Sequence, residues 1–452
     1  MAVSMAIILG GGAVAIRQLR PVVTAFGRGF AQGVADGVAG RTPQPAGSSA
    51  GATSPSVGAA PPDATTVYPA VVPPGTPVVA VFLPSADEVG ELGREAWDAL
   101  TYYLDRFGRT PPVQLRRYDT HDDQDAARCE QQARLSLGHR AEVAALGSIG
   151  ELCTYALAIE LNRPGAQAPL LVTGGSTTGA LTVDRPGTGL PDQFRPSHQH
   201  TVARIIATDA QEAAAVADHV LKVVHAKRCA VLEDHSAESA IMTEAFRSRA
   251  RKIGLTVPWV ATRADDEAGL RRQFEQIKRL KANCLYLSGV DSHRVEQVLT
   301  VKRAVLGDQH RTPVVMSAYQ AAEFDWEKPS VATGVWVANQ LVWPYDDLPT
   351  PVAEEFMADY DLANIDQANW PSSLLNVAAL QVIIKGIQQS DHSRAGIRRA
   401  VLNGREFVLP ARTSMLGELR LDGRTGDAVH PRIQFITLDS ASDSKVSTRL
   451  AP

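Results

Sequence analysis

The chain has 452 residues, of which 44% are hydrophobic and 21% are charged, and its formal net charge is -4 at pH 7. This composition is typical of a soluble globular protein with two or three domains. The charge argues against a nucleic-acid-binding protein, because phosphate binding requires clustered lysine and arginine. There are four cysteines and none forms a CxxC pair, which argues against a disulfide-dense scaffold, a zinc site or a redox motif.

Residues 1–26 form an apolar segment that resembles a signal peptide or a membrane anchor. As a helix, the run from Met1 to Ile16 would span about 24 Å, which is short for a hydrocarbon layer of about 30 Å but suits a signal-peptide core. Arg17 and Arg20 follow this run, and the positive-inside rule would then hold the downstream chain in the cytoplasm. We expect an extracytoplasmic protein, exported or anchored, that touches the membrane only through this segment. A body on the cytoplasmic face is the alternative.

Residues 27–77 are predicted to be a Pro/Ala/Gly/Ser-rich linker. Residues 42–77 contain nine prolines, and Asp63 is their only charge. Such a segment buries too little apolar surface to offset the entropy lost on ordering. We therefore expect a semi-rigid tether between the apolar segment and a globular body.

From Val78 onward, strand patterns alternate with helix patterns. The continuous apolar runs are typical of buried parallel strands, and the apolar spacing between them is helical. This alternation indicates a parallel sheet with helices on both faces. The predicted strands are 78–83, 113–118, 143–147 and 170–173, and the predicted helices are 92–107, 126–137 and 155–161.

A second, similar unit begins near Thr208. Thr208 and Gln211 have the spacing of a capping box, which predicts a helix through Val224. The pattern of the first unit then repeats, so the chain contains two α/β units in tandem. The predicted strands are 229–232, 256–261, 284–288 and 313–317, and the further helices are 243–253, 270–280 and 295–305.

The last part of the chain adds elements to these units. Residues 334–339 read as a strand, followed by helices at 351–361 and 373–389. The second of these helices is apolar on most faces and should be buried. Residues 406–438 carry strand signals, and Asp422 with Gly423 is a hairpin signature.

The order of these elements, together with several local strings, resembles the leucine/isoleucine/valine-binding branch of type I periplasmic binding proteins. The strings are VFLPSADEVGELGREAWDAL (81–100), LVTGGSTTGALT (171–182), RCAVLEDHSAESAIMTEAF (228–246) and GVWV (334–337).

The resemblance implies an α/β fold of two doubly wound parallel-sheet lobes joined by three hinge crossings. The crossings are expected near 204–208, 335–342 and 405–420. The domains are then 78–205 plus 340–395 for the first lobe, 206–339 plus 396–440 for the second, and 441–452 as a tail.

The implied function is reversible binding of a small polar ligand, such as an amino acid, between the two lobes. The chain would be the substrate-binding component of an ABC transporter, with the transporter's membrane subunits as partners, and would need no cofactor. A tethered sensor domain that signals to a partner is the alternative. A hydrolytic enzyme is a third and weaker reading, since serine, histidine and aspartate are plentiful. His198 and His200 lack a nearby third ligand, so no metal is expected.

The loop 174–179 is the main candidate ligand site in the first lobe. Its glycines allow backbone N–H groups to approach an anion, and its hydroxyls donate hydrogen bonds. By resemblance, Gly175 and Thr177 hold a ligand carboxylate, with Ser176 between them. The alternative is a flexible turn between a strand and a helix.

The loop after the third strand offers a second candidate position. The resemblance places a ligand contact on Ser148, Glu151 or Thr154, depending on the alignment gap. A glutamate would repel a ligand carboxylate and attract an ammonium group. The alternative for Glu151 is a helix start, where its charge stabilises the positive end of the helix.

The second lobe departs from the family pattern. Glu238 and Asp291 stand where the family commonly has tyrosine or glycine, and Tyr319 lies near the position of the acidic residue that holds an ammonium group. Glu238 and Asp291 are candidate ligand contacts or, alternatively, solvated loop charges.

The cysteines fall into two pairs. In an exported protein we expect a disulfide between Cys129, on the second predicted helix, and Cys153, just after the third strand. Cys229 and Cys284 are expected to be buried thiols.

Overall fold

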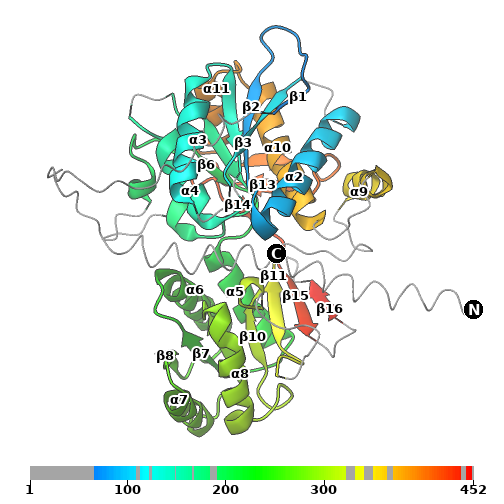
Figure 1. The fold of residues 1–452 in the computed structure, drawn as a ribbon. Coiled ribbons are helices and arrows are strands. Elements are labelled where there is room, and N and C mark those ends of the chain that lie inside the picture. Colours follow the sequence, from blue (N-terminus) through cyan, green and yellow to red (C-terminus); the bar gives the residue numbers. More distant parts are fainter. Residues whose placement is uncertain are drawn as a thin grey trace, which may run out of the picture.

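The computed structural model describes residues 66–107, 112–121, 125–147, 149–164, 167–183, 191–321, 331–340, 350–363, 370–438 and 444–449. This part of the chain forms two α/β lobes that lie one above the other in Figure 1, as the sequence predicts. The apolar segment 1–26 and the linker up to residue 65 lie outside the described residues.

The first lobe is built on a sheet that is parallel except for its edge strand β1. Its central strands are fully buried apolar runs such as 78–83, because a strand covered on both faces has no solvent-facing side. In spatial order the strands are β1 (Val67–Tyr68), β3 (Gln114–Asp119), β2 (Val78–Leu83), β4 (Glu142–Leu146), β5 (Leu170–Thr173) and β6 (Val202–Arg204).

Helices cover both faces of this sheet. Successive side chains of β2 point to opposite faces, so Val81 packs in one apolar core and Phe82 in the other. The helix predicted at 373–389 is buried, as expected. The first core contains α2 (Asp87–Arg106), α9 (Pro351–Ala363), α10 (Trp370–Gln388) and α11 (Arg394–Val401), and the second contains α3 (Ala126–Gly138), α4 (Glu151–Leu161) and the short turns η1 (Gly179–Leu181) and η2 (Asp192–Phe194).

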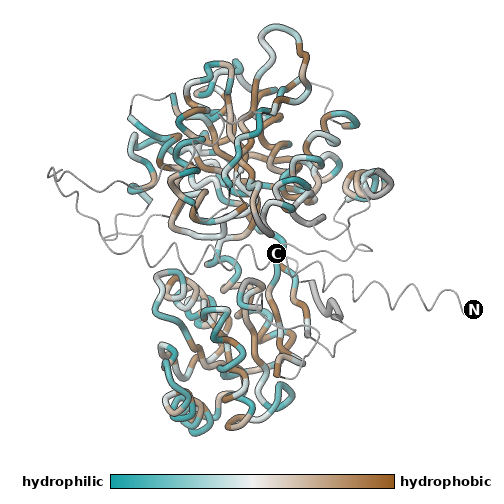
Figure 2. The backbone as a smooth tube through the Cα atoms, in the orientation of Figure 1, coloured by the Kyte–Doolittle hydropathy of each residue, from teal (hydrophilic) through white to brown (hydrophobic). Residues whose placement is uncertain are grey.

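The second lobe repeats this arrangement. The predicted capping box at the start of α5 is confirmed, since the Thr208 hydroxyl accepts from the Gln211 N–H and the Gln211 side chain accepts in return. In Figure 2 the strands in the middle of each lobe consist largely of hydrophobic residues, whereas the outer helices include many hydrophilic residues. The strands, in spatial order, are β16 (Ser444–Arg449), β15 (Gln434–Leu438), β11 (Trp336–Asn339), β10 (Val314–Ser317), β9 (Cys284–Ser288), β7 (Cys229–Glu233) and β8 (Val260–Thr262). The helices are α5 (Asp209–Lys222), α6 (Ala237–Ile253), α7 (Glu267–Arg279) and α8 (Ser292–Leu306), with the short turn η3 (Ala318–Ala321).

The structure divides residues 396–440, which the sequence analysis assigned to the second lobe, between the two lobes. Helix α11 and strands β12 (Phe407–Leu409), β13 (Leu419–Leu421) and β14 (Ala428–Val429) pack on the core of the first lobe. Among the described residues of this range, β15 alone joins the second sheet. The third crossing therefore lies at 429–433 and not at 405–420. The apolar spacing shows that these residues are buried, but not against which core.

Both ends of the predicted body also extend further than expected. Residues 67–68, predicted to be linker, form β1 at the edge of the first sheet, where the Tyr68 hydroxyl donates to Asp105. In the predicted tail, β16 pairs with β15. The hairpin signature at Asp422 and Gly423 is confirmed, since these residues join β13 to β14.

The cysteine predictions are confirmed. Cys129 and Cys153 form a disulfide between α3 and α4, with a Cα–Cα distance of 5.4 Å. Cys229 and Cys284 are free, buried and paired in register on β7 and β9. Burial and the adjacent Cys284 raise the pKa of the Cys229 thiol well above its usual value.

Candidate functional site

The two lobes share the same strand order, and each order reverses at one point. In the first lobe the reversal lies between β2 and β4, and in the second between β7 and β9. Ligands of open α/β sheets bind beyond the carboxyl ends of strands at such points. Glu151, Glu238 and Asp291 lie at the starts of the helices that follow β4, β7 and β9.

Glu151 is the first residue of α4, and its carboxylate lies against the loop after β5. It accepts hydrogen bonds from the Thr177 N–H at 2.6 Å, the Thr178 N–H at 3.1 Å and the Ser176 hydroxyl at 2.8 Å. A Cβ on Gly175 would lie 2.2 Å from the Ile149 carbonyl oxygen, so glycine permits this close approach. The donors predicted to hold a ligand carboxylate thus hold the carboxylate of Glu151.

Asp209, the first residue of α5, lies on the other side of Thr177. Its N–H donates to the Thr177 carbonyl at 2.9 Å, and the Thr177 hydroxyl interacts with both Asp209 and Glu151. The Asp209 side chain is 4% exposed, and its Oδ2 has no hydrogen-bond partner. Burial and the charge of Glu151 raise the pKa of Asp209 to about 8, so this carboxyl carries a proton at neutral pH.

Tyr155 lies one turn after Glu151 on α4 and connects the acidic residues of both lobes. Burial raises the pKa of its hydroxyl well above the usual value, and the charges of Glu151, Glu238 and Asp209 raise it further. Because Glu238 belongs to α6, acidic residues of both lobes act on this hydroxyl. We refer to Glu151, Asp209 and Glu238, whose charges act on the Tyr155 hydroxyl, as the carboxylate cluster.

The other predicted site residues have different surroundings. Asp291 caps α8 by accepting from the His293 N–H at 3.1 Å. The Thr154 hydroxyl donates to the Gly150 carbonyl at 2.7 Å, within its own helix. Ser148 and the side chain of Tyr319 lie outside the described residues. The structure therefore brings Ser176 and Thr177 against Glu151, while Glu238 acts electrostatically on Tyr155 from the second lobe.

Sequence reasoning missed Arg204, which is fully buried at the base of the first crossing. Its guanidinium donates to the Thr178 carbonyl at 2.6 Å and to the Thr182 hydroxyl at 2.9 Å, and pairs with Asp427 at 3.2 Å. These contacts join the loop after β5 to the hairpin that precedes the third crossing. A lone arginine in the apolar run 202–207 was the signal available in the sequence.

Glu212, on α5, links the first crossing to the second. Its buried carboxylate accepts from the Ser317 hydroxyl and from Gln340 Nε2, the latter at 2.7 Å. Burial raises the pKa of Glu212, and the hydrogen bonds from Gln340 and Ser317 oppose that shift. Polar contacts therefore join the segments that run between the lobes.

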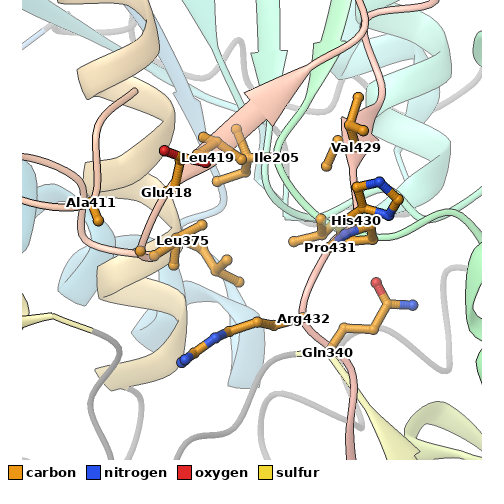
Figure 3. Close-up of a pocket in the computed structure, with 14 residues that line it drawn as sticks. Ile205, Gln340, Leu375, Ala411, Glu418, Leu419, Val429, His430, Pro431 and Arg432 are labelled. Atoms are coloured by element: carbon orange, nitrogen blue, oxygen red, sulfur yellow. The ribbon is translucent and has the colours of Figure 1, made fainter. Parts of the chain in front are cut away.

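A pocket of about 340 Å³ lies beside these segments. Figure 3 shows Ile205, Gln340 and Val429, one from each segment, arranged around it. Leu375 and Ile205 also lie 3.2 and 3.3 Å from where a Cβ on Gly174 would stand, so the pocket adjoins the loop after β5. Because its walls belong to segments that join both lobes, a rotation of the lobes would change its shape.

The described residues contain neither a group of metal ligands nor a membrane-spanning helix. No set of three or more histidine, cysteine, aspartate or glutamate side chains there is arranged to hold a metal ion. None of the helices described is both long enough and apolar enough to cross a membrane.

Comparison with known proteins gives one family match. The family model described as periplasmic binding protein matches residues 79–443. No curated protein matches the chain in sequence.

Solved structures of low sequence identity share the fold. A leucine-binding protein, LivK, from Thermotoga maritima is 17% identical, with 83% of this chain and 99% of that chain covered and a TM-score of 0.59. An ABC transporter substrate-binding protein from Desulfitobacterium hafniense in complex with leucine is 15% identical, with 82% and 100% covered and a TM-score of 0.63. A solute-binding protein of an ABC transporter from Rhodopseudomonas palustris, in complex with 3,4-dihydroxybenzoic acid, is 14% identical, with 83% and 97% covered and a TM-score of 0.57.

Proposed function

Because the chain belongs to the periplasmic binding protein family, we propose that it binds a small polar ligand reversibly between its lobes and delivers it to an ABC transporter. The ligand would contact the loop after β5 in the first lobe and the start of α6 in the second. It would undergo no reaction, since the role of the protein is capture and release.

The carboxylate cluster is the observation that supports this proposal most strongly. Buried polar groups are normally satisfied, and those left without partners raise the free energy of the folded state. Here Asp209 Oδ2 lacks a partner, and the charges of Glu151 and Glu238, one from each lobe, act on the Tyr155 hydroxyl where the strand orders of the two sheets reverse. A ligand that bound these groups would contact both lobes at once, which favours a closed state.

An extracytoplasmic location fits both the family and the disulfide. Disulfides persist in oxidising compartments outside the cytoplasm, and Cys129–Cys153 closes a buried helix pair. We propose that residues 1–26 direct export or anchor the chain, and that residues 27–65 tether the lobes to the membrane close to the transporter subunits.

A thermal-shift screen of the full chain against amino acids, amines, carboxylates, small amides and sugars tests the proposal. A ligand at about 100 times its dissociation constant adds about 2.7 kcal/mol to the free energy of unfolding. Binding of no member of the screen would contradict the proposed function.

The Thr177→Val variant then tests the location of the site. It keeps the shape of the side chain but removes the hydroxyl that meets Glu151 and Asp209. We expect affinity to fall by about 10- to 150-fold, because the hydroxyl holds the acidic groups that would face the ligand and a hydrogen bond to a charged group is worth roughly 1.5–3 kcal/mol. Thr300→Val removes an exposed helical hydroxyl on α8 and serves as the control. Unchanged affinity in Thr177→Val would place the ligand elsewhere.

A further inference from the structure

We infer that the ligand site between the lobes accepts the primary ammonium group of a ligand that carries no neighbouring carboxylate, and that Glu151 occupies the position such a carboxylate would take. This inference rests on the proposed binding between the lobes. It names the chemical class of the ligand, which neither the fold nor the family match specifies.

The anion-binding donors of the loop after β5 are already used. Glu151 Oε1 accepts from the Thr177 and Thr178 N–H groups, and Oε2 accepts from the Ser176 hydroxyl. These donors lie in a buried setting, where like charges repel strongly. A ligand carboxylate would have to displace Glu151 or stand beside it, and both arrangements are unfavourable.

Carboxyl groups outnumber cations around the site. Glu151, Asp209 and Glu238 all act on the Tyr155 hydroxyl, and Glu212 also acts on Asp209. Arg204 is the cation that lowers the pKa of Asp209, but it is ion-paired with Asp427 at 3.2 Å. Asp209 therefore keeps a proton in the absence of ligand, and a cationic ligand would favour release of that proton and an ion pair with the resulting carboxylate.

One buried carboxyl oxygen of the cluster lacks a hydrogen-bond donor. Asp209 is 4% exposed, and its Oδ2 accepts no hydrogen bond, although buried carboxyl oxygens normally do. A primary ammonium carries three N–H donors and one positive charge, which suits this oxygen together with the neighbouring acidic groups. The described residues offer no group of side chains arranged for a metal ion, so the observations favour an organic cation over a divalent metal.

The experiment compares three compounds with the same hydrocarbon body. Isoamylamine has the amine alone, 4-methylpentanoate has the carboxylate alone, and L-leucine has both. A second series of 2-phenylethylamine, 3-phenylpropanoate and L-phenylalanine repeats the comparison with a larger body. Melting temperature and calorimetric titration of the full-length protein are the readouts. We expect an amine to raise the melting temperature and to bind at least about tenfold more tightly than its matched amino acid, while the matched carboxylate does not bind.

Variants of Glu151 test its assigned role. Glu151→Gln keeps the size of the side chain and an acceptor oxygen for the loop, so it should fold and bind the amine at least about tenfold more weakly. Glu151→Ala frees the loop donors, so it should gain affinity for 4-methylpentanoate or 3-phenylpropanoate. Glu267→Ala is the matched control, because Glu267 is also the first residue of a helix but is exposed and paired with Arg271 on α7. It should bind the amine as the wild type does.

The outcomes separate this inference from the proposed function. Wild-type binding of leucine or phenylalanine as tight as that of the matched amine overturns the inference, although it agrees with the proposed function. An unchanged amine affinity in Glu151→Gln also overturns it. Failure of every amine to bind overturns the inference alone when another solute in the broad screen binds, and overturns both when none does.

Discussion

The Cys129–Cys153 disulfide should contribute substantially to the stability of the first lobe. The bridge closes a loop with a sequence separation of 24 residues between two buried helix positions. In the chain-entropy model, closing a loop of about 25 residues removes conformational entropy from the unfolded chain. This raises the free energy of the unfolded state by about 3.5 kcal/mol at 25 °C. Reduction should therefore lower the free energy of unfolding by about that amount.

The assay is equilibrium urea unfolding followed by circular dichroism, with and without dithiothreitol. The wild type should lose stability in reductant, whereas Cys129→Ser with Cys153→Ser should be less stable than the oxidised wild type and insensitive to reductant. Cys229 and Cys284 are free thiols in the second lobe and are present in both proteins, so they do not contribute to the difference. Superimposable wild-type curves, with the bridge shown to be reduced by mass mapping, would refute the reasoning.

Three further predictions concern buried charges. Burial raises the pKa of Asp209 in the folded state to about 8 from its ordinary 3.8. Between about pH 4 and pH 8 the folded state therefore keeps a proton that the unfolded state releases, so stability falls as the pH rises through this range. Asp209→Asn should remove this fall, and urea unfolding at pH 5, 6.5 and 8 should show the variant gaining about 1.4 kcal/mol per pH unit over the wild type. His219 is buried against Phe435, and burial lowers its pKa from 6.5 to about 3. As the pH drops below 6.5, the unfolded state binds a proton that the folded state does not, so stability falls. His219→Phe should abolish this loss of stability, which amounts to about 2.7 kcal/mol at pH 4.5. If the free energies of unfolding of variant and wild type changed in parallel with falling pH, the assignment to His219 would be contradicted. Arg204→Met should lower the free energy of unfolding by about 3–5 kcal/mol, because it leaves Asp427 buried without its cation. Thermal unfolding equal to that of the wild type would show that the ion pair does not stabilise the fold to this extent.

Much of the fold could be predicted from the sequence because its strands are short continuous apolar runs. The segments 78–83, 170–173 and 284–288 form strands with the bounds that the patterns predict. Hydrophobic pattern specifies burial but not the partner, so α11 and β12 to β14 were placed in the wrong lobe. Contacts between residues far apart in the chain decide that choice.

The candidate site could be predicted only in part. The sequence identified both the loop 174–179 and Glu151 as candidates. For each, it allowed a ligand-binding interpretation and a purely structural one. That the glutamate accepts the loop's hydrogen bonds depends on the approach of Gly175 to Ile149, which no local pattern encodes. Asp209 was read only within a capping box, and its burial results from the packing of the lobes. Tyr155, four residues after Glu151, could have been found from helical spacing.

Small-angle X-ray scattering of the full chain, with and without a saturating ligand from the screen, tests most directly whether the two lobes close on a ligand. A ligand that contacts the loop after β5 and the start of α6 at the same time would draw the two lobes together, so we expect a smaller radius of gyration in the presence of ligand. An unchanged radius at saturation, confirmed by calorimetry on the same sample, would contradict closure of the lobes on the ligand.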